Sequence, residues 1–303
     1  MSTLLEDKVI IVTGSGRGVG ECIAHYCAEK GAKVVVNDLG KDEQGNSTAD
    51  GVVAAIKENG GEAIVSKDNI ADWSGAEKLI QAAMDTWGKV DGIVNNAGIL
   101  RDRIFHKMSE EEWDQVINVN LKGCFNTARV AAPYLKEQGS GSIVHMTSSS
   151  GLVGNFGQSN YSASKMGVVG LSKSIALDMQ RFGVRSNCIA PFAMTPMVMN
   201  GIPKETEEEK ARWKIIERME PRKVAPLVAA LLSDSASHIT GQIFGARANE
   251  VYFFSQPRPV RTAHIGDADG ISAEAIVERV FPMFKDDFYD LDRSMDVFTW
   301  DPV

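Results

Sequence analysis

Tyr161 and Lys165 stand four residues apart in the run Tyr161-Ser162-Ala163-Ser164-Lys165, a spacing that puts both side chains on one face of a helix. A free phenol ionises near pH ~10 and is a poor general base at neutral pH. A fixed ammonium one turn away favours the phenolate, so the pair could exchange a proton with a carbinol or a ketone. Tyr-x-x-x-Lys arises by chance in many helices, so the surrounding sequence decides its meaning.

A run of hydroxyls precedes this pair, at Thr147-Ser148-Ser149-Ser150. It follows a β-branched stretch that we expect to be a buried strand, at the point where the chain leaves the sheet. A hydroxyl there can hydrogen-bond a carbonyl or carbinol oxygen of a substrate. The alternative is that these serines only cap a helix or form a turn.

A glycine-rich turn lies near the N-terminus, in the segment Thr13-Gly14-Ser15-Gly16-Arg17-Gly18-Val19-Gly20. Glycines let the backbone approach a pyrophosphate, and the N-terminus of a following helix offers it free N–H groups. The spacing is G-x-x-x-G-x-G through Gly14, Gly18 and Gly20. Such a turn predicts a dinucleotide site only if a strand precedes it and a helix follows it.

Asp38 ends the next β-branched stretch, 18 residues beyond Gly20. A carboxylate there can accept both ribose hydroxyls of NAD and would repel the 2′-phosphate of NADP. Arg17 favours NADP instead, because its guanidinium could pair with that phosphate. We expect the carboxylate to dominate and predict NAD.

Strand-like and helix-like stretches alternate, which predicts one α/β domain with a doubly wound (Rossmann), seven-stranded parallel sheet and helices on both faces. The ligand crevice should lie at the carboxyl ends of the strands. The expected strands are Lys8–Thr13, Lys33–Asp38, Glu62–Ser66, Val90–Val94, Ser142–Thr147, Val184–Ala190 and Gln242–Ala246. The expected helices are Gly18–Lys30, Asn46–Asn59, Ser74–Trp87, Ser109–Gln138 and Gln158–Phe182.

Two segments extend this plan. Residues 203–222 mix charges with Trp213, Ile215 and Ile216, and we interpret them as either a solvated surface helix or, over about 193–222, a lid above the crevice. Residues 1–250 form the dehydrogenase-sized domain, and 251–303 form a C-terminal extension. Residues 262–303 hold ten acids against three Lys or Arg, with aromatics between them. We expect this extension to be ordered, capping a substrate pocket or packing on a neighbouring subunit.

Composition excludes several classes of protein. A net charge of −8 argues against nucleic-acid binding. The four cysteines and five histidines form no metal-ligand spacing, so we expect no metal and reduced thiols. No apolar run is long enough to span a membrane, and no targeting signal is evident, which makes the cytoplasm the expected location.

Taken together, these motifs resemble the short-chain dehydrogenase/reductase family. Residues 8–246 carry them in the family's order: Thr13-Gly14-x-x-x-Gly18-x-Gly20, Asn95-Asn96-Ala97-Gly98, Asn120, Ser148 and Tyr161-x-x-x-Lys165. The resemblance implies that Tyr161 is the acid/base, that Lys165 assists it and holds the nicotinamide ribose, and that Ser148 polarises the substrate oxygen. It implies that Asn120 holds a water of a proton relay.

The same resemblance implies the rest of the cofactor site. Asn96, Ala97 and Gly98 would line the cofactor, and Asn69-Ile70 stand where the family often has Asp-Val beside adenine. Pro191 and Thr195 would flank the carboxamide. The family usually has glycine after that proline, whereas this chain has Phe192, so the backbone near the nicotinamide is expected to differ.

The stretches Asn95–Ser109 and Gly151–Lys165 are similar to the D-3-hydroxyacyl-CoA dehydrogenase domain of peroxisomal multifunctional enzymes and to bacterial relatives. This similarity implies NAD-dependent oxidation of an (R)-3-hydroxyacyl-CoA or a hydroxysteroid by a homotetramer or dimer. Two alternatives stay open: an NADPH-dependent 3-oxoacyl reductase, and a regulator that binds NAD without turnover. Arg101 and Arg103 could meet CoA phosphates or belong to a surface ion-pair cluster.

Overall fold

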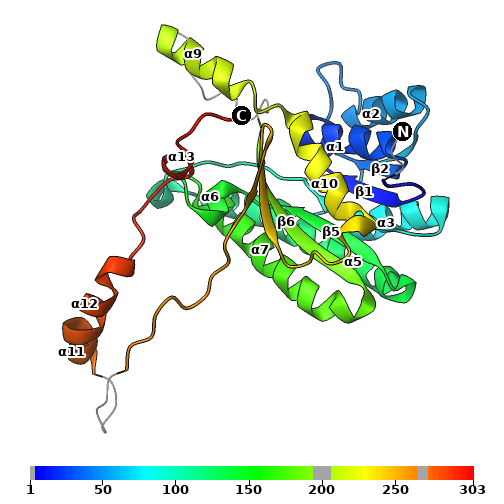
Figure 1. Cartoon of the computed structure of the whole chain (residues 1–303). Helices are drawn as coiled ribbons and strands as arrows, with labels where there is room; N and C mark the ends of the chain where they lie inside the picture. The colour runs from blue at the N-terminus through cyan, green and yellow to red at the C-terminus, as the bar shows by residue number, and fades with distance from the viewer. Residues whose placement is uncertain (1–3, 194–205, 265–271) are drawn as a thin grey trace.

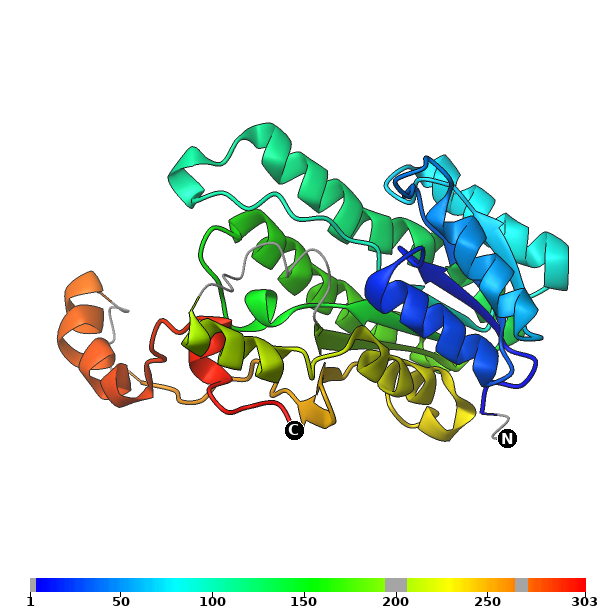
Figure 2. The same cartoon turned by 90° about the horizontal axis from the view of Figure 1, so that it is seen from above.

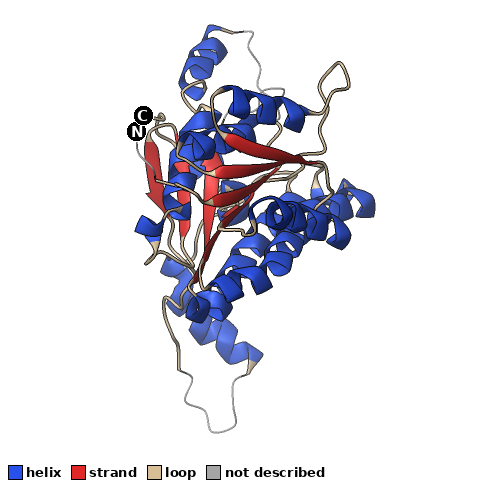
Figure 3. Ribbon diagram, turned by 90° about the vertical axis from the view of Figure 1, so that its right-hand side faces the viewer, coloured by secondary structure: helices blue, strands red, loops and turns tan. Residues whose placement is uncertain are grey.

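A computed structural model describes residues 4–193, 206–264 and 272–303. Its centre is one twisted sheet in the strand order β3-β2-β1-β4-β5-β6-β7-β8, drawn in red among the helices in Figure 3. The strands are β1 Val9–Thr13, β2 Lys33–Asn37, β3 Glu62–Ser66, β4 Gly92–Asn95, β5 Gly141–Met146, β6 Val184–Phe192, β7 Ile243–Arg247 and β8 Glu250–Phe253.

The first seven strands are parallel, as the alternation of elements predicted. Their sequences are continuous apolar runs because both faces of the sheet are covered, and every residue of β1 is buried. The prediction missed the eighth strand. β8 pairs with β7 antiparallel, with Arg247 opposite Glu250. The expected domain boundary at residue 250 therefore falls at the start of a strand of the same sheet.

Helices cover the two faces of the sheet in the doubly wound pattern (Figure 1). The helices α1 (Gly18–Glu29), α2 (Thr48–Glu58) and α10 (Ala225–Leu232) pack on one face. The helices α3 (Trp73–Trp87), α5 (Gly123–Gln138) and α7 (Ser159–Met179) pack on the other. Ile23 on α1 and Leu135 on α5 are fully buried on opposite sides of the sheet.

The expected helix Ser109–Gln138 has a break in its middle. α4 (Glu110–Ile117) begins at a capping box formed by Ser109 and Glu112. A π-helical turn then spans Asn118–Lys122 before α5 continues. Such turns are rare and occur often at functional sites, and this one contains Asn120.

The segment expected as a lid is described only in part. Residues 194–205 lie outside the described residues. Beyond them, α9 (Glu207–Ile216) starts at a capping box between Thr206 and Glu209, and Trp213 is buried. The interpretation of residues 193–222 as a lid therefore stays untested.

The C-terminal extension follows the sheet edge and then leaves it. Short helical turns, α11 (Ala273–Ala275), a π turn (Ile276–Val280) and α12 (Phe281–Phe284), stand away from the sheet (Figures 1 and 2). The chain returns through α13 (Ser294–Val297), and the C-terminal Val303 accepts a hydrogen bond from Asn249 N–H. In the described part of the chain, no helix is long and apolar enough to cross a membrane.

Candidate active site

The expected crevice lies where the strand order reverses between β1 and β4. On one side of this point β2 follows β1 in the sheet, and on the other side β5 follows β4. The loops after β1 and β4 therefore diverge and leave room at the carboxyl ends of these two strands. The glycine-rich turn, Asp38, the Asn95–Gly98 run and Ser148 all follow strands at this edge. The fold thus brings together motifs that are distant in the sequence.

α7 places Tyr161 and Lys165 one turn apart, as predicted. Lys165 is buried, and its Nζ lies 5.6 Å from the centre of the Tyr161 ring. The same Nζ donates to the Met146 carbonyl at the end of β5, 2.7 Å away. Because an ammonium has three donors, two remain for other partners. Thr147 Oγ1 also donates to the Lys165 carbonyl, which ties α7 to the end of β5.

Ser148 begins the short helix α6 (Ser149–Leu152). Its Oγ accepts the N–H of Ser150 at 3.1 Å. Ser148 therefore caps the helix, as the alternative interpretation of the serine run expected. Its hydroxyl proton is not used by this cap, so it can still be donated to a substrate oxygen. Ser150 is buried and supplies the backbone N–H that fixes this orientation.

Asn120 is fully buried beside the same lysine. Its Oδ1 accepts the N–H of Ile99 at 2.8 Å, and its Nδ2 donates to the Ile99 carbonyl at 3.1 Å. The π turn thus directs the amide onto the backbone that follows Gly98. Sequence reasoning gave Asn120 a water-holding role and missed this clamp.

Gly98 lies beside both of these groups. A Cβ built on Gly98 would lie 3.4 Å from Asn120 Oδ1 and 3.6 Å from Lys165 Nζ, which are ordinary packing distances. Gly98 therefore brings the backbone close to an amide oxygen that can accept a hydrogen bond and an ammonium that can donate one.

The glycine-rich turn packs closely against neighbouring backbone. Gly14 and Gly18 have positive φ angles of 64° and 63°. A Cβ on Gly14 would lie 2.6 Å from Ala97 Cα, and a Cβ on Gly20 would lie 2.2 Å from the Gly14 carbonyl oxygen. The turn therefore packs directly against the end of β4. Arg17 precedes α1 and makes no side-chain cap, so its guanidinium does not hold the helix end.

Asp38 is fixed by two backbone donors. Its Oδ2 accepts the N–H of Gly16 at 2.9 Å, and its Oδ1 accepts the N–H of Gly40 at 2.6 Å. The half-buried carboxylate therefore faces the glycine-rich turn. A nucleotide whose pyrophosphate lay over that turn would place its adenosine ribose near this acid, and the carboxylate could accept hydrogen bonds from the ribose hydroxyls, so the residues present fit a dinucleotide.

The Asn95–Gly98 run is held against β1. Thr13 Oγ1 accepts the N–H groups of Asn96 and Ala97, both at 3.1 Å. The Asn96 amide donates to the Thr13 and Gly14 carbonyls at 3.0 and 2.9 Å. Asn96 therefore acts as a brace for the glycine-rich turn, and the lining role expected of Asn96, Ala97 and Gly98 stays a prediction.

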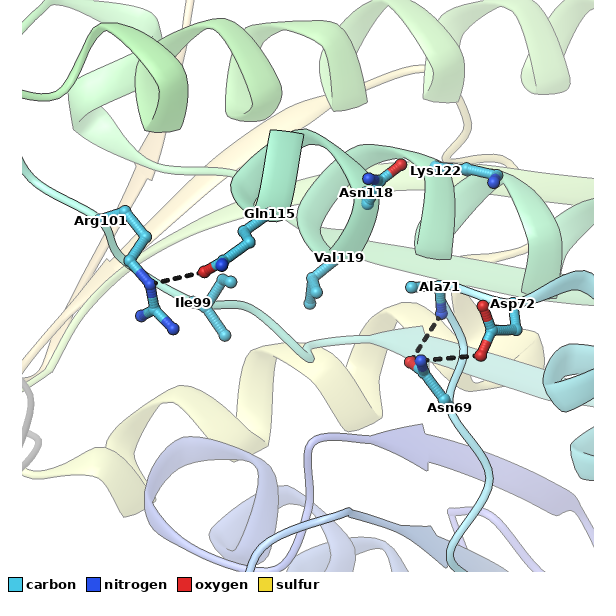
Figure 4. A pocket seen from close by; sticks show the side chains of 9 residues that line it. All are labelled: Asn69, Ala71, Asp72, Ile99, Arg101, Gln115, Asn118, Val119 and Lys122. Carbon is cyan, nitrogen blue, oxygen red and sulfur yellow. Dashed lines mark hydrogen bonds between the residues drawn. The ribbon is translucent and has the colours of Figure 1, made fainter. Parts of the chain in front are cut away.

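A cleft of about 550 Å³ opens beside this run (Figure 4). Asn69 lies on one wall, where its Oδ1 accepts Ala71 N–H and its Nδ2 donates to Asp72. Ile99 and Val119 face it from the other wall. Ile70 itself is buried in the core, and its carbonyl accepts from Asn126. Of the predicted Asn69-Ile70 pair, only Asn69 lines this cleft.

Arg101 and Arg103 are engaged in local contacts on the surface. Arg101 Nε donates to Gln115 Oε1 at 2.8 Å (Figure 4). Arg103 pairs with Glu112 at 3.0 Å. The ion-pair interpretation is thus confirmed for Arg103, and the structure gives no separate support for a role with CoA phosphates.

Sequence reasoning missed a buried polar cluster beneath the site. Thr127 Oγ1 donates to Asn95 Oδ1 at 2.6 Å, and the Asn95 amide lies 3.3 Å from Nδ1 of His145. Burial, together with the charge of Lys165, lowers the pKa of His145 to about 3. His145 is therefore neutral at working pH. A lone histidine within a strand gave no signal for this cluster.

β6 extends two residues beyond the strand predicted over Val184–Ala190. β6 runs through Pro191 to Phe192, and Pro191 pairs with Ala246 of β7. The Phe192 ring packs on Tyr252 and Phe298 of the extension. Thr195, expected to bind the carboxamide, lies outside the described residues.

Comparisons with known proteins agree with this geometry. A family model described as short chain dehydrogenase matches residues 8–206. The chain belongs to the short-chain dehydrogenase family. A putative short-chain type dehydrogenase/reductase of Mycobacterium tuberculosis is 44% identical over 77% of this chain and 80% of the relative. A short chain dehydrogenase structure from Mycobacterium avium superposes with a TM-score of 0.83 at 36% identity, covering 95% of this chain and 97% of the other.

Two further relatives differ in kind. The peroxisomal multifunctional enzyme type 2 of Mus musculus is 41% identical over 78% of this chain, which spans only 31% of that longer enzyme. The 3-oxoacyl-[acyl-carrier-protein] reductase of Thermotoga maritima is 37% identical over 80% of this chain and 96% of the relative. The family establishes this chain as an oxidoreductase that acts on a hydroxyl or keto group with a nicotinamide cofactor.

Proposed function

We propose that this dehydrogenase uses NAD to oxidise a secondary hydroxyl to a ketone, on an (R)-3-hydroxyacyl-CoA or a hydroxysteroid. The observation that carries the cofactor assignment is the anchored carboxylate of Asp38, held by Gly16 and Gly40 N–H. A fixed acid can accept the ribose hydroxyls of NAD, whereas a 2′-phosphate at the same place would meet its charge. The similarity of residues 95–109 and 151–165 to hydroxyacyl-CoA dehydrogenase domains supports the substrate class.

The cofactor would lie along the glycine-rich turn, with its adenosine ribose at Asp38 and its adenine in the cleft beside Asn69. Ala97 and Gly98 would line it, and Lys165 would hold the nicotinamide ribose with a donor not used by Met146. When bound, the nicotinamide supplies a hydride acceptor. All other steps fall to side chains of this chain.

Those steps concern one proton. The substrate hydroxyl would lie between Ser148, which donates to its oxygen, and the Tyr161 phenolate, which takes its proton and becomes the phenol. The Lys165 charge near the Tyr161 ring favours the ionised phenol. A water held by Asn120 and reached by Lys165 would then pass the proton outward.

One experiment tests both the cofactor and the substrate. Activity is measured with NAD and with NADP over hydroxyacyl-CoA thioesters, hydroxysteroids and simple secondary alcohols. We expect a higher kcat/KM with NAD and turnover of one of the two complex classes. A preference for NADP would refute the role of Asp38.

A second candidate is an NADPH-dependent reductase of 3-oxoacyl groups. It is favoured by the near-complete coverage of the Thermotoga maritima reductase and by Arg17 in the glycine-rich turn. Preference for NADPH with a 3-oxoacyl thioester would establish it. Absence of turnover with all substrates and both cofactors would favour the non-catalytic regulator.

A further inference from the structure

The cleft beside Asn69 has one apolar wall and one polar wall. Ile99 and Val119 form the apolar wall, and Asn69, Ala71 and Asp72 lie opposite them (Figure 4). A flat heterocycle can pack on the aliphatic side chains while its polar edge meets the other wall. The side chains of the polar wall therefore decide which edge the cleft accepts.

The amide of Asn69 has two unlike ends. Its Oδ1 accepts hydrogen bonds and its Nδ2 donates them, whereas an aspartate at this position would present two equivalent acceptor oxygens. The exocyclic amino group of adenine is a donor. Asn69 can therefore bond that group only when Oδ1, and not Nδ2, faces the base. The orientation of one amide decides whether the site favours adenine.

Two neighbours fix the orientation of this amide. Asn69 Nδ2 donates to Asp72 Oδ2 at 2.9 Å, and Asn69 Oδ1 accepts the Ala71 N–H at 3.1 Å (Figure 4). An ionised carboxylate only accepts and a backbone N–H only donates, so turning the amide over would break both hydrogen bonds. In Figure 4, Asp72 lies on the side of Asn69 away from Ile99 and Val119. The hydrogen bond to Asp72 thus leaves Oδ1 on the side of the apolar wall.

Asp72 is available for this contact because its side chain does not cap its own helix. It is the N-cap residue of α3, where an aspartate commonly accepts a hydrogen bond from an N–H of the first helical turn. Its carboxylate makes no such bond. The Asp72 carbonyl accepts the Ala76 N–H at 3.1 Å, so the helix begins without the side chain. The carboxylate contacts Asn69 instead of the helix end.

The backbone that carries the pair is held from behind. Asn126, buried on α5, donates from Nδ2 to the carbonyls of Ile70 and Ala71 at 2.9 and 3.1 Å. A Cβ on Gly75 would lie 2.1 Å from the Asn69 carbonyl oxygen, so the first turn of α3 packs tightly on this segment. Because the backbone is fixed on both sides, the orientation of the amide depends on the groups that contact its side chain.

We propose, on the basis of the proposed placement of adenine in this cleft, that Asp72 is a positioning residue. It holds Asn69 Nδ2, so that Oδ1 faces the cleft and accepts the amino group of adenine. The pair then discriminates against a base that carries a carbonyl at the same place, because two acceptor oxygens would face each other. The effect of Asp72 on the base passes through Asn69.

Hypoxanthine is the matched probe, because it has a carbonyl in place of the adenine amino group and a proton on the adjacent nitrogen. Isothermal titration calorimetry on the full chain measures Kd for NADH and for reduced nicotinamide hypoxanthine dinucleotide. We expect the wild type to bind NADH at least about tenfold more tightly, since the analogue loses a hydrogen bond and leaves Oδ1 facing an acceptor. Equal affinity of the wild type for the two would overturn the proposal.

Asp72→Asn replaces the carboxylate with an amide of the same shape that can accept or donate. Asn69 can then pair with it in either orientation, so the preference for NADH should fall to less than about threefold. A merely structural loosening would weaken both dinucleotides alike and keep their ratio. Asp85→Asn, at an exposed acid near the other end of α3, is the matched control and should keep the wild-type ratio. A wild-type ratio in Asp72→Asn would sink the positioning role.

Exchange of the two side chains tests whether Asp72 acts through Asn69. The double variant Asn69→Asp with Asp72→Asn keeps a hydrogen bond between the two positions and reverses its direction. The carboxylate now at position 69 presents an acceptor in either orientation. The preference for NADH should therefore return to about tenfold. A ratio no higher than in Asp72→Asn alone would mean that Asp72 does not act through its neighbour.

The same measurements separate the positioning role from the proposed function. Adenine is common to NAD and NADP, so a preference for NADP would refute the role of Asp38, and NADPH with its hypoxanthine analogue would then test Asp72. Tight NADH binding with a ratio that Asp72→Asn leaves unchanged would refute the positioning role alone. Failure to bind either cofactor or ADP-ribose would refute both.

Discussion

The ring of Phe192, at the end of β6, lies 4.6 Å from the ring of Phe298, near the C-terminus, at an angle of 64°. Tyr252 and Trp300 complete the same aromatic cluster. The phenylalanine that replaces the family's usual glycine thus has a packing partner in the extension. The C-terminal segment is thereby joined to the strand that ends beside the expected nicotinamide position.

A double-mutant cycle on Phe192 and Phe298 should give a coupling of about 0.5–1.5 kcal/mol, as edge-to-face aromatic pairs do. Urea unfolding of Phe192→Ala, Phe298→Ala and the double variant measures it. Phe253→Ala, an exposed aromatic on β8 whose ring packs on Phe244 instead, is a suitable comparison. Additive effects of the first two changes would mean that the rings do not stabilise each other.

Tyr161→Phe removes only the phenolic oxygen, so the helix and the Lys165 position should persist. We expect kcat to fall by about 10²–10⁴-fold, the usual contribution of a general acid/base. Tyr26→Phe, on α1, should keep native activity. Equal activity in Tyr161→Phe and wild type would exclude the proposed proton transfer.

Asp38→Ser should weaken NAD binding and relieve repulsion of a 2′-phosphate. A lost charge-assisted hydrogen bond of about 1.5–3 kcal/mol corresponds to a rise of roughly 10–150-fold in KM for NAD. We expect the NAD/NADP ratio of kcat/KM to fall accordingly. Glu43→Gln, an exposed acid in the same loop, should leave the ratio unchanged. An unaltered ratio in Asp38→Ser would place the ribose elsewhere.

Gly98→Ala places a methyl group against Asn120 Oδ1 and Lys165 Nζ without a steric clash, because its Cβ would have only ordinary contacts. If a water relays protons between these two groups, the methyl group should hinder its approach, and kcat should fall about tenfold or more at neutral pH. The KM for substrate should change little, and added small amines should partly restore kcat. Gly170→Ala, on α7 with open space, should have no such effect. Full activity in Gly98→Ala would remove the water from the mechanism.

Buried His145 should make the protein sensitive to acid. Its folded pKa is lowered to about 3 from the usual 6.5, so the unfolded chain binds the proton more readily. Stability is therefore unaffected above pH 6.5 and falls as the pH drops from 6.5 towards 3, by roughly 1.4 kcal/mol per unit. His145→Asn should flatten this loss in denaturant unfolding at pH 5 and pH 7. An identical pH slope in both proteins would show that another group causes it.

The parallel sheet and most of the proposed site follow from local sequence. Strands buried on both faces must be continuous apolar runs, and helix caps such as Ser47 and Ser109 have their own signatures. Tyr161 and Lys165 share a helix, so their juxtaposition is set by helical geometry alone. Gly14 and Gly20 are required by close backbone approach, which the glycine spacing already indicated.

Only the tertiary structure decided what distant residues do to one another. The clamp of Asn120 on Ile99 and the burial of His145 beside Lys165 depend on strand order and on a π turn, neither of which has a local pattern. β8 and the aromatic cluster around Phe298 arose because the chain turns back on β7 after residue 249. Contacts of this kind join residues far apart in the chain, so they stabilise the protein only once the sheet is assembled.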